Sequence, residues 1–151
     1  MGATAGLIAA TKDERIAGVI GEGCYDRLDA VVRNRLDAGL PVPAGAFASL
    51  TLWMMELYSG VSFDGVEPVD LYRDLNRRPV LLVHGNSDET MPPKMSGRII
   101  ENAEADVRRV LADGDHQSTF TEDRERYESA VMSFLRTLTQ DDQSEGAKNG
   151  R

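Results

Sequence analysis

The sequence has one cysteine, no long apolar run and no early basic residue. Cys24 cannot form a disulfide within the chain, a usage typical of a reducing compartment. No run of 18 or more apolar residues is present, so no segment is predicted to span a bilayer. The first basic residue is Lys12, and the small apolar stretch before it lacks the charged region of a signal peptide. We therefore expect a cytoplasmic protein.

Positive charge and metal-binding residues are also scarce. Lys and Arg number 17 against 25 Asp and Glu, a formal net charge of −8. Nucleic acids and anionic membranes bind basic surfaces, so neither is predicted as a partner. The two histidines, His84 and His116, have no cluster of ligand residues beside them, so no metal is expected. The glycines at 18, 21 and 23 do not match a dinucleotide-binding pattern, and no cofactor is expected.

The remaining composition is that of one modest globular domain. The chain has 151 residues, of which 41% are hydrophobic and 28% charged. Helices alternate with short apolar runs, an order that predicts an α/β fold with about three parallel strands flanked by helices. One strand would keep an unpaired edge. The expected helices cover 2–11, 26–38, 47–57, one turn at 69–72, a segment from Pro92, and 121–138, and the expected strands cover 15–20, 79–85 and 106–111.

Two polar side chains follow the second and third predicted strands. Asp88 stands in H-G-N-S-D-E-T-M-P-P, just beyond the strand at 79–85, and His116 stands in D-G-D-H, beyond the strand at 106–111. Loops at the carboxyl ends of parallel strands share one crevice, so these side chains are expected to meet. An imidazole can take a proton from a weakly nucleophilic hydroxyl, and a carboxylate can orient that imidazole. Alone, each residue has a plain alternative: His116 as a surface turn residue and Asp88 as an acid before a helix.

The same residues carry a resemblance to a known family. The pattern R-P-V-L-L-V-H-G-x-x-D-x-x-x-P, which contains Asp88, resembles the acid-bearing strand and loop of the α/β-hydrolases. The stretch G-D-H that ends at His116 resembles the loop of their catalytic histidine. The start, M-G-A-T-A, is similar to the residues that follow the serine in elbows of the type G-x-S-M-G. Residues 26–72 resemble the helical lid of esterase-like and peptidase-like members.

The resemblance implies a partial α/β-hydrolase fold, its C-terminal half, over residues 1–138. A small helical lid insertion would occupy about 24–77, and 139–151 would form a flexible tail. In a Ser-His-Asp triad, His116 would be the general base and acid and Asp88 its orienter, while Met1 would hold the oxyanion-hole position. The serine would stand one position before Met1, so the chain is expected to be truncated, through a misplaced start or a shortened gene.

The implied activity of the full-length relative is hydrolysis of a small-molecule ester or amide through an acyl-enzyme, with no metal or organic cofactor. Whether this chain is itself an enzyme stays open, because the serine nucleophile is missing from it. The alternative is a non-catalytic interaction module or degenerate gene fragment. Such a module would self-associate or pair with a partner chain through its exposed strand edge. Ester turnover and labelling by a serine-directed probe separate the two.

Other residues invite a functional reading and have a structural alternative. His84 competes with His116, yet a hydrogen-bonded structural histidine is the favoured interpretation. Cys24 follows a strand but is favoured as a small buried residue. Glu22 is interpreted as a strand-end group that lines the crevice. Trp53, Met54 and Met55 could line an acyl pocket, although packing in the core or lid is favoured.

Overall fold

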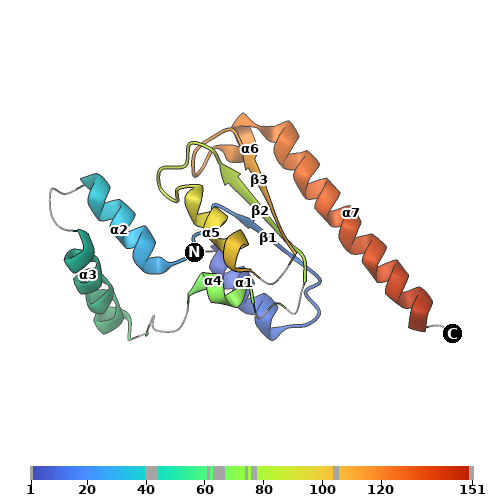
Figure 1. The fold of residues 1–151 in the computed structure, drawn as a ribbon, viewed down its shortest axis with the longest axis horizontal. Coiled ribbons are helices and arrows are strands. Elements are labelled where there is room, and N and C mark those ends of the chain that lie inside the picture. Colours follow the sequence, from blue (N-terminus) through green and yellow to red (C-terminus); the bar gives the residue numbers. More distant parts are fainter. Residues whose placement is uncertain are drawn as a thin grey trace.

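The computed structural model describes residues 2–39, 44–60, 62, 67–73, 75, 78–103 and 106–149. Helices and strands alternate as expected, with three consecutive helices after the first strand (Figure 1). The order is α1 (Gly2–Lys12), β1 (Val19–Glu22), α2 (Leu28–Gly39), α3 (Ala44–Ser59), α4 (Pro68–Leu71), β2 (Val80–Gly85), α5 (Lys94–Asn102), β3 (Val107–Ala112), α6 (Thr119–Glu122) and α7 (Arg124–Asn149).

The three strands form one parallel sheet in the order β1-β2-β3, which confirms the expected α/β architecture. Val80 of the central strand β2 pairs with Val19 of β1 and with Val107 of β3. Every residue of β2 is buried, as its continuous apolar run predicted. Among the described residues, the outer edges of β1 and β3 are unpaired.

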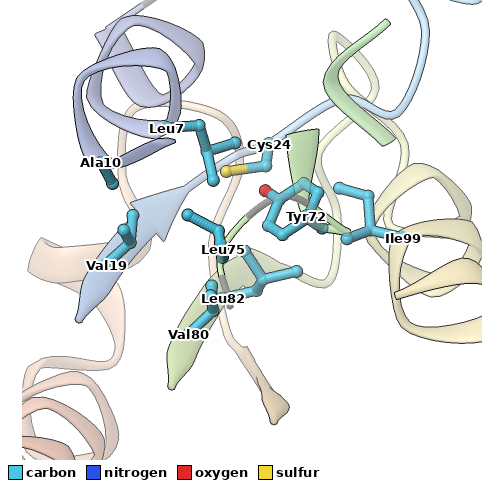
Figure 2. Close-up of a cluster of buried hydrophobic side chains, with 9 residues drawn as sticks. All are labelled: Leu7, Ala10, Val19, Cys24, Tyr72, Leu75, Val80, Leu82 and Ile99. Carbon is cyan, nitrogen blue, oxygen red and sulfur yellow. The ribbon is translucent and has the colours of Figure 1, made fainter. Parts of the chain in front are cut away.

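Alternate residues of β2 face two hydrophobic cores, one on each side of the sheet. Val80 and Leu82 join the core beneath α1 and α5, which also contains Leu7, Cys24 and Ile99 among others (Figure 2). On the other face, the second core packs α7 against the sheet and is built on Leu81, Val83 and Phe134. The result is a sheet covered by helices on both faces.

The helical insertion lies away from the sheet. Helices α2 and α3 pack on each other at one side of the molecule (Figure 1). The insertion begins at an ion pair between Asp26, which is buried, and the half-buried Arg98 of α5. The backbone N–H of Val69 donates to the carbonyl of Asp26. No helix in the described ranges has both the length and the apolar character needed to cross a bilayer.

The first strand starts later than expected. The sequence predicted a strand over 15–20, whereas β1 covers Val19–Glu22. The guanidinium of Arg78 donates to the carbonyls of Asp13 and Ile16, at 3.1 and 3.0 Å. These carbonyls belong to a turn that leads into the sheet. The strand therefore begins after this turn, at Val19, and continues through Gly21 and Glu22.

The final helix is longer than expected. The last helix was expected to end near residue 138, but α7 continues through Asn149. No proline interrupts residues 139–149. The absence of an apolar repeat therefore did not end the helix, because helical propensity does not require one.

Candidate active site

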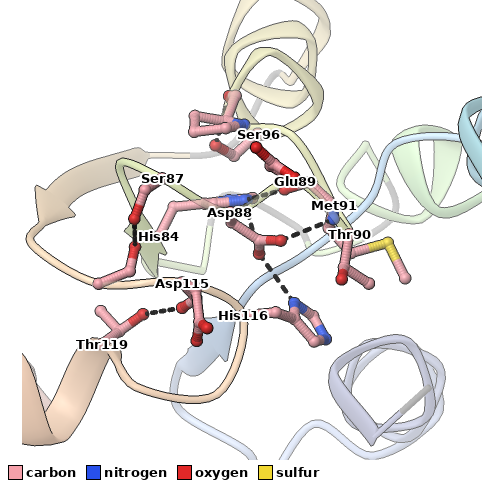
Figure 3. Close-up of polar contacts among 12 residues, drawn as sticks. His84, Ser87, Asp88, Glu89, Thr90, Met91, Ser96, Asp115, His116 and Thr119 are labelled. Atoms are coloured by element: carbon pink, nitrogen blue, oxygen red, sulfur yellow. Dashed lines mark hydrogen bonds and ion pairs between the residues drawn. The ribbon is translucent and has the colours of Figure 1, made fainter. Parts of the chain in front are cut away.

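The structure brings Asp88 and His116 together at the carboxyl ends of two neighbouring strands. Asp88 lies three residues after the end of β2, and His116 lies four residues after the end of β3. Nδ1 of His116 is 2.8 Å from Oδ2 of Asp88, a hydrogen bond across the two loops (Figure 3).

Backbone and side-chain hydrogen bonds hold the two loops against each other. The backbone N–H and the hydroxyl of Ser87 both donate to the carbonyl of Gly114, at 3.1 and 2.8 Å. The amide side chain of Asn86 donates to Asp113, and its backbone N–H donates to Ala112. The segments that lead into Asp88 and His116 are therefore hydrogen-bonded to each other just before the pair.

The turn that carries His116 is organised by Asp115. Its carboxylate accepts the backbone N–H groups of Gln117 and Ser118, which lower the pKa of Asp115. Its carbonyl accepts the hydroxyl of Thr119, which is buried at the start of α6. The imidazole thus projects from a turn whose polar groups are paired.

Asp88 is almost fully buried, with 2% exposure, and receives a donor on each oxygen. Oδ1 accepts the backbone N–H of Met91 at 2.7 Å, and Oδ2 accepts His116. A buried carboxylate is stable when such donors compensate its lost hydration. Because an ionised carboxylate only accepts, Nδ1 of His116 carries the proton and Nε2 keeps its lone pair. This is the tautomer required of a general base.

Gly23 forms the floor beneath the imidazole. It follows β1 directly and has a φ of +56°, a conformation that favours glycine. A Cβ atom at this position would lie 2.9 Å from Cε1 of His116 and 3.7 Å from Oδ2 of Asp88. The sequence suggested only a strand end here, and a glycine directly after a predicted strand was the available signal.

His116 opens onto a pocket of about 380 Å³. The side chain of His116 is 34% exposed, and Arg35 of α2 lines the same pocket. Asn34, next to Arg35, donates to the carbonyls of Glu89 and Thr90 at 2.9 and 3.4 Å. Helix α2 is therefore hydrogen-bonded to the loop that carries Asp88. A larger hollow of about 610 Å³ runs along β3 and α7, but it contains neither member of the pair.

His84 and Cys24 have the structural roles that the sequence favoured. His84 is completely buried, and burial lowers its pKa. Cys24 is 4% exposed within the first core, and burial raises the pKa of its thiol to about 11. At neutral pH this thiol is protonated and a poor nucleophile.

Two other interpretations of side chains need correction, and one stays untested. Glu22 accepts a hydrogen bond from the hydroxyl of Tyr127 on α7 at 3.1 Å and is not among the residues lining the pocket at His116. Trp53, Met54 and Met55 are not buried in a core, because α3 leaves them 58%, 57% and 42% exposed. Only the core part of that interpretation is wrong, since Trp53 lines a hollow of about 320 Å³ between α2 and α3. Met1, the expected oxyanion-hole position, lies outside the described residues.

The donor set around the pair does not favour a metal ion. No group of three or more His, Cys, Asp or Glu side chains with suitable placement occurs in the described part of the chain. The oxygens of Asp88 are already occupied by Met91 and His116. The arrangement can accept a proton at Nε2 of His116 and stabilise the resulting imidazolium.

Comparison with known proteins supports the fold. No family model matches the sequence. The protein YqkD of Bacillus subtilis (strain 168), described as uncharacterized, is 26% identical over 113 residues, which cover 74% of this chain and 36% of YqkD. The chain therefore spans just over a third of the length of this relative.

Solved structures resemble the chain over about nine-tenths of its length. An esterase of Pyrococcus furiosus has a TM-score of 0.64 at 17% identity, covering 90% of this chain and 50% of the esterase. The esterase domain of a Rhodothermus marinus protein has a TM-score of 0.60 at 18% identity, covering 91% of this chain and 56% of that one. An acylaminoacyl peptidase of Pyrococcus horikoshii has a TM-score of 0.60 at 14% identity, covering 91% of this chain and 22% of the peptidase. The chain thus has part of the α/β-hydrolase fold, over about half the length of these esterases.

Proposed function

We propose that Asp88 and His116 supply the acid and base of a serine hydrolase site that cleaves an ester or amide bond. The observation that carries the proposal is the 2.8 Å hydrogen bond between Nδ1 of His116 and Asp88. The imidazole of His116 also lines a pocket, and its Nε2 has no hydrogen-bond partner among the described residues. An oriented histidine with a free nitrogen is the part of a triad that activates a hydroxyl.

In the proposed reaction, Nε2 of His116 takes the proton from a serine hydroxyl as its oxygen attacks the substrate carbonyl. The imidazolium, stabilised by Asp88, then returns the proton to the leaving alcohol or amine, and an acyl-enzyme forms. Water repeats the sequence, with His116 again as base and then acid, and the acid product and free serine result. No metal or organic cofactor enters these steps.

The proposal places the serine at the amino-terminal end of α1. A Cβ atom on Gly21 would lie 3.9 Å from the Cβ of Ala3, so the first turn of α1 lies beside the same strand end as Gly23 and His116. In the described part of the chain, no hydroxyl donates to Nε2 of His116. The start of an 11-residue helix also offers free backbone N–H groups to a developing oxyanion.

The edge of β1 that is unpaired among the described residues is where a serine-bearing strand could pair. A strand that pairs along this edge would run beside α1 and could bring a serine to the helix start, as a strand-turn-helix elbow does. The same edge is the surface through which the chain would self-associate or bind a partner chain if it acts as an interaction module.

The test uses the protein that carries these residues, at the length found in cells. A fluorophosphonate probe is expected to label a serine directly before Met1, identified by peptide mass mapping. His116→Ala should lower both labelling and hydrolysis of a short nitrophenyl ester by at least about 10³-fold. Gln140→Ala, at an exposed position of α7 outside this pocket, is the control and should leave both close to unchanged.

Hydrolysis that survives His116→Ala would refute the proposal. Absence of both labelling and hydrolysis, together with a stable complex that depends on the edge of β1, would instead favour the interaction module. Ester hydrolysis without a labelled serine would mean that a different nucleophile serves the site.

A further inference from the structure

The buried imidazole of His84 has no part in the proposed proton transfer but contacts the loop that carries Asp88. It projects from the central strand β2 and is 0% exposed. Its Nε2 is 2.5 Å from the carbonyl oxygen of Met91. Its Nδ1 is buried and has no hydrogen-bond partner among the described residues. Since the carbonyl only accepts, Nε2 carries the proton and donates to Met91.

Met91 connects this histidine to the catalytic carboxylate. The backbone N–H of Met91 donates to Oδ1 of Asp88 at 2.7 Å, while its carbonyl accepts from His84. Both polar backbone groups of this one residue are therefore held by side chains of the site (Figure 3). Strand β2 is thus linked to Asp88 by two hydrogen bonds, from His84 to Met91 and from Met91 to Oδ1 of Asp88. The other oxygen of Asp88 contacts His116.

We propose that His84 is a positioning residue, which holds the Asp88 carboxylate toward His116 by fixing the backbone of Met91. The inference rests on the proposed function in so far as the Asp88–His116 pair is the catalytic one. Second contacts of this kind hold reacting groups in the productive geometry, where a displacement of about 1 Å lowers rates on the order of 10²-fold.

The neutral state of His84 suits this role. Nε2 of His84 is also 3.5 Å from Oδ2 of Asp88, the oxygen that accepts His116. A charged His84 would compete with His116 for this carboxylate. Burial lowers the pKa of His84, so the ring stays neutral and leaves the negative charge of Asp88 to His116.

Nuclear magnetic resonance of the full chain labelled with ¹⁵N-histidine tests the inference without relying on turnover. The sequence has two histidines, so His116 is the sole imidazole left in a His84 variant. In the unmodified protein, the N–H resonances of both rings should be protected from exchange. In His84→Leu, the His116 signal should exchange roughly tenfold faster or disappear, the effect of about one lost hydrogen bond.

Two further variants separate positioning from general destabilisation. His84→Gln keeps an amide donor that can reach Met91, so it should restore much of the protection of His116. Val83→Ala, at the adjacent buried position on β2, removes core volume but no donor and should keep the His116 signal. A His116 signal that is unchanged in folded His84→Leu would overturn the inference, as would equal losses in His84→Leu and Val83→Ala.

A measurement that needs no change at His84 completes the test. A coupling across the hydrogen bond from His84 Nε2 to the Met91 carbonyl carbon should be present in the unmodified protein and should persist in Asp88→Asn. Its absence overturns the inference even if His84→Leu does not fold. Absence of a protected His116 signal from the unmodified protein would instead contradict the proposed function itself.

Discussion

Gly23 lies directly against the imidazole of His116, and a Cβ atom on it would stand 2.9 Å from Cε1 of that ring. The end of β1 therefore contacts His116, although β1 contributes no side chain to the pair. Three neighbouring strand ends meet at one point: Gly23 follows β1, the loop after β2 carries Asp88, and the loop after β3 carries His116.

We predict that Gly23→Ala displaces His116 from Asp88. The added methyl group would collide with the imidazole of His116, so hydrolysis should fall on the order of 10²-fold. The alanine must also adopt the φ of +56°, which should lower the free energy of unfolding by about 1–3 kcal/mol. Gly60→Ala is the matched control, because Gly60 has a φ of +68° but nothing within 4 Å of an added Cβ. Urea unfolding should find similar destabilisation in both, and an activity loss shared by both would contradict the contact with His116.

The sequence was sufficient to predict the Asp88–His116 pair. Parallel strands place their carboxyl ends at one edge of the sheet, and the resemblance of the two loops to those of the α/β-hydrolases singled out Asp88 and His116 among the polar residues there. The support from Gly23 and Met91 was not predictable in the same way. Met91 acts through its backbone, which no side-chain pattern records, and Gly23 acts through the absence of a side chain.

The helical insertion shows a different limit of the sequence. The apolar spacing of Phe47, Leu50 and Met54 correctly predicted a helix, but it also suggested burial, whereas each is between 44% and 57% exposed. Periodicity reports that a helix has an apolar face and does not say what covers that face. The late start of β1 likewise depended on Arg78, a residue far along the chain that binds the carbonyls of Asp13 and Ile16.

We predict that Cys24 resists modification in the folded chain and reduces stability at high pH. Burial raises its pKa from 9.0 to about 11, so a thiol reagent at pH 7.5 should react after unfolding and not before. The folded state holds the thiol proton more tightly than the unfolded state does. The contribution of Cys24 to the free energy of unfolding is therefore fully present below pH 9 and is lost as pH rises toward 11. Between these values, the free energy of unfolding should fall by roughly 2–3 kcal/mol more than in Cys24→Ala. Identical pH profiles for the two proteins would refute this.

We predict that Arg98→Met is more destabilising than loss of a surface ion pair. It would leave the carboxylate of Asp26, which is 2% exposed, without its guanidinium partner. A fully buried pair would cost about 3–5 kcal/mol, but Arg98 is 41% exposed and water can compensate in part, so we expect roughly 2–3 kcal/mol. Arg73→Met breaks the exposed pair with Asp70 and should cost less than about 1 kcal/mol in the same urea titration. Equal losses would contradict a buried role for Asp26.

We predict that Asn34→Ala loosens the contact between α2 and the Asp88 loop without disturbing the Asp88–His116 hydrogen bond. The side chain of Asn34 donates to the carbonyls of Glu89 and Thr90, and it is the hydrogen-bonded link between α2 and the Asp88 loop seen within the described residues. Removing it should speed amide exchange in that loop and raise KM several-fold with kcat almost unchanged, because the Asp88–His116 contact does not involve α2. Asn102→Ala is the matched control, since Asn102 donates to a carbonyl of its own helix, that of Arg98. A fall in kcat with KM unchanged would contradict this prediction. It would mean that α2 positions the reacting groups themselves and does not act through substrate binding.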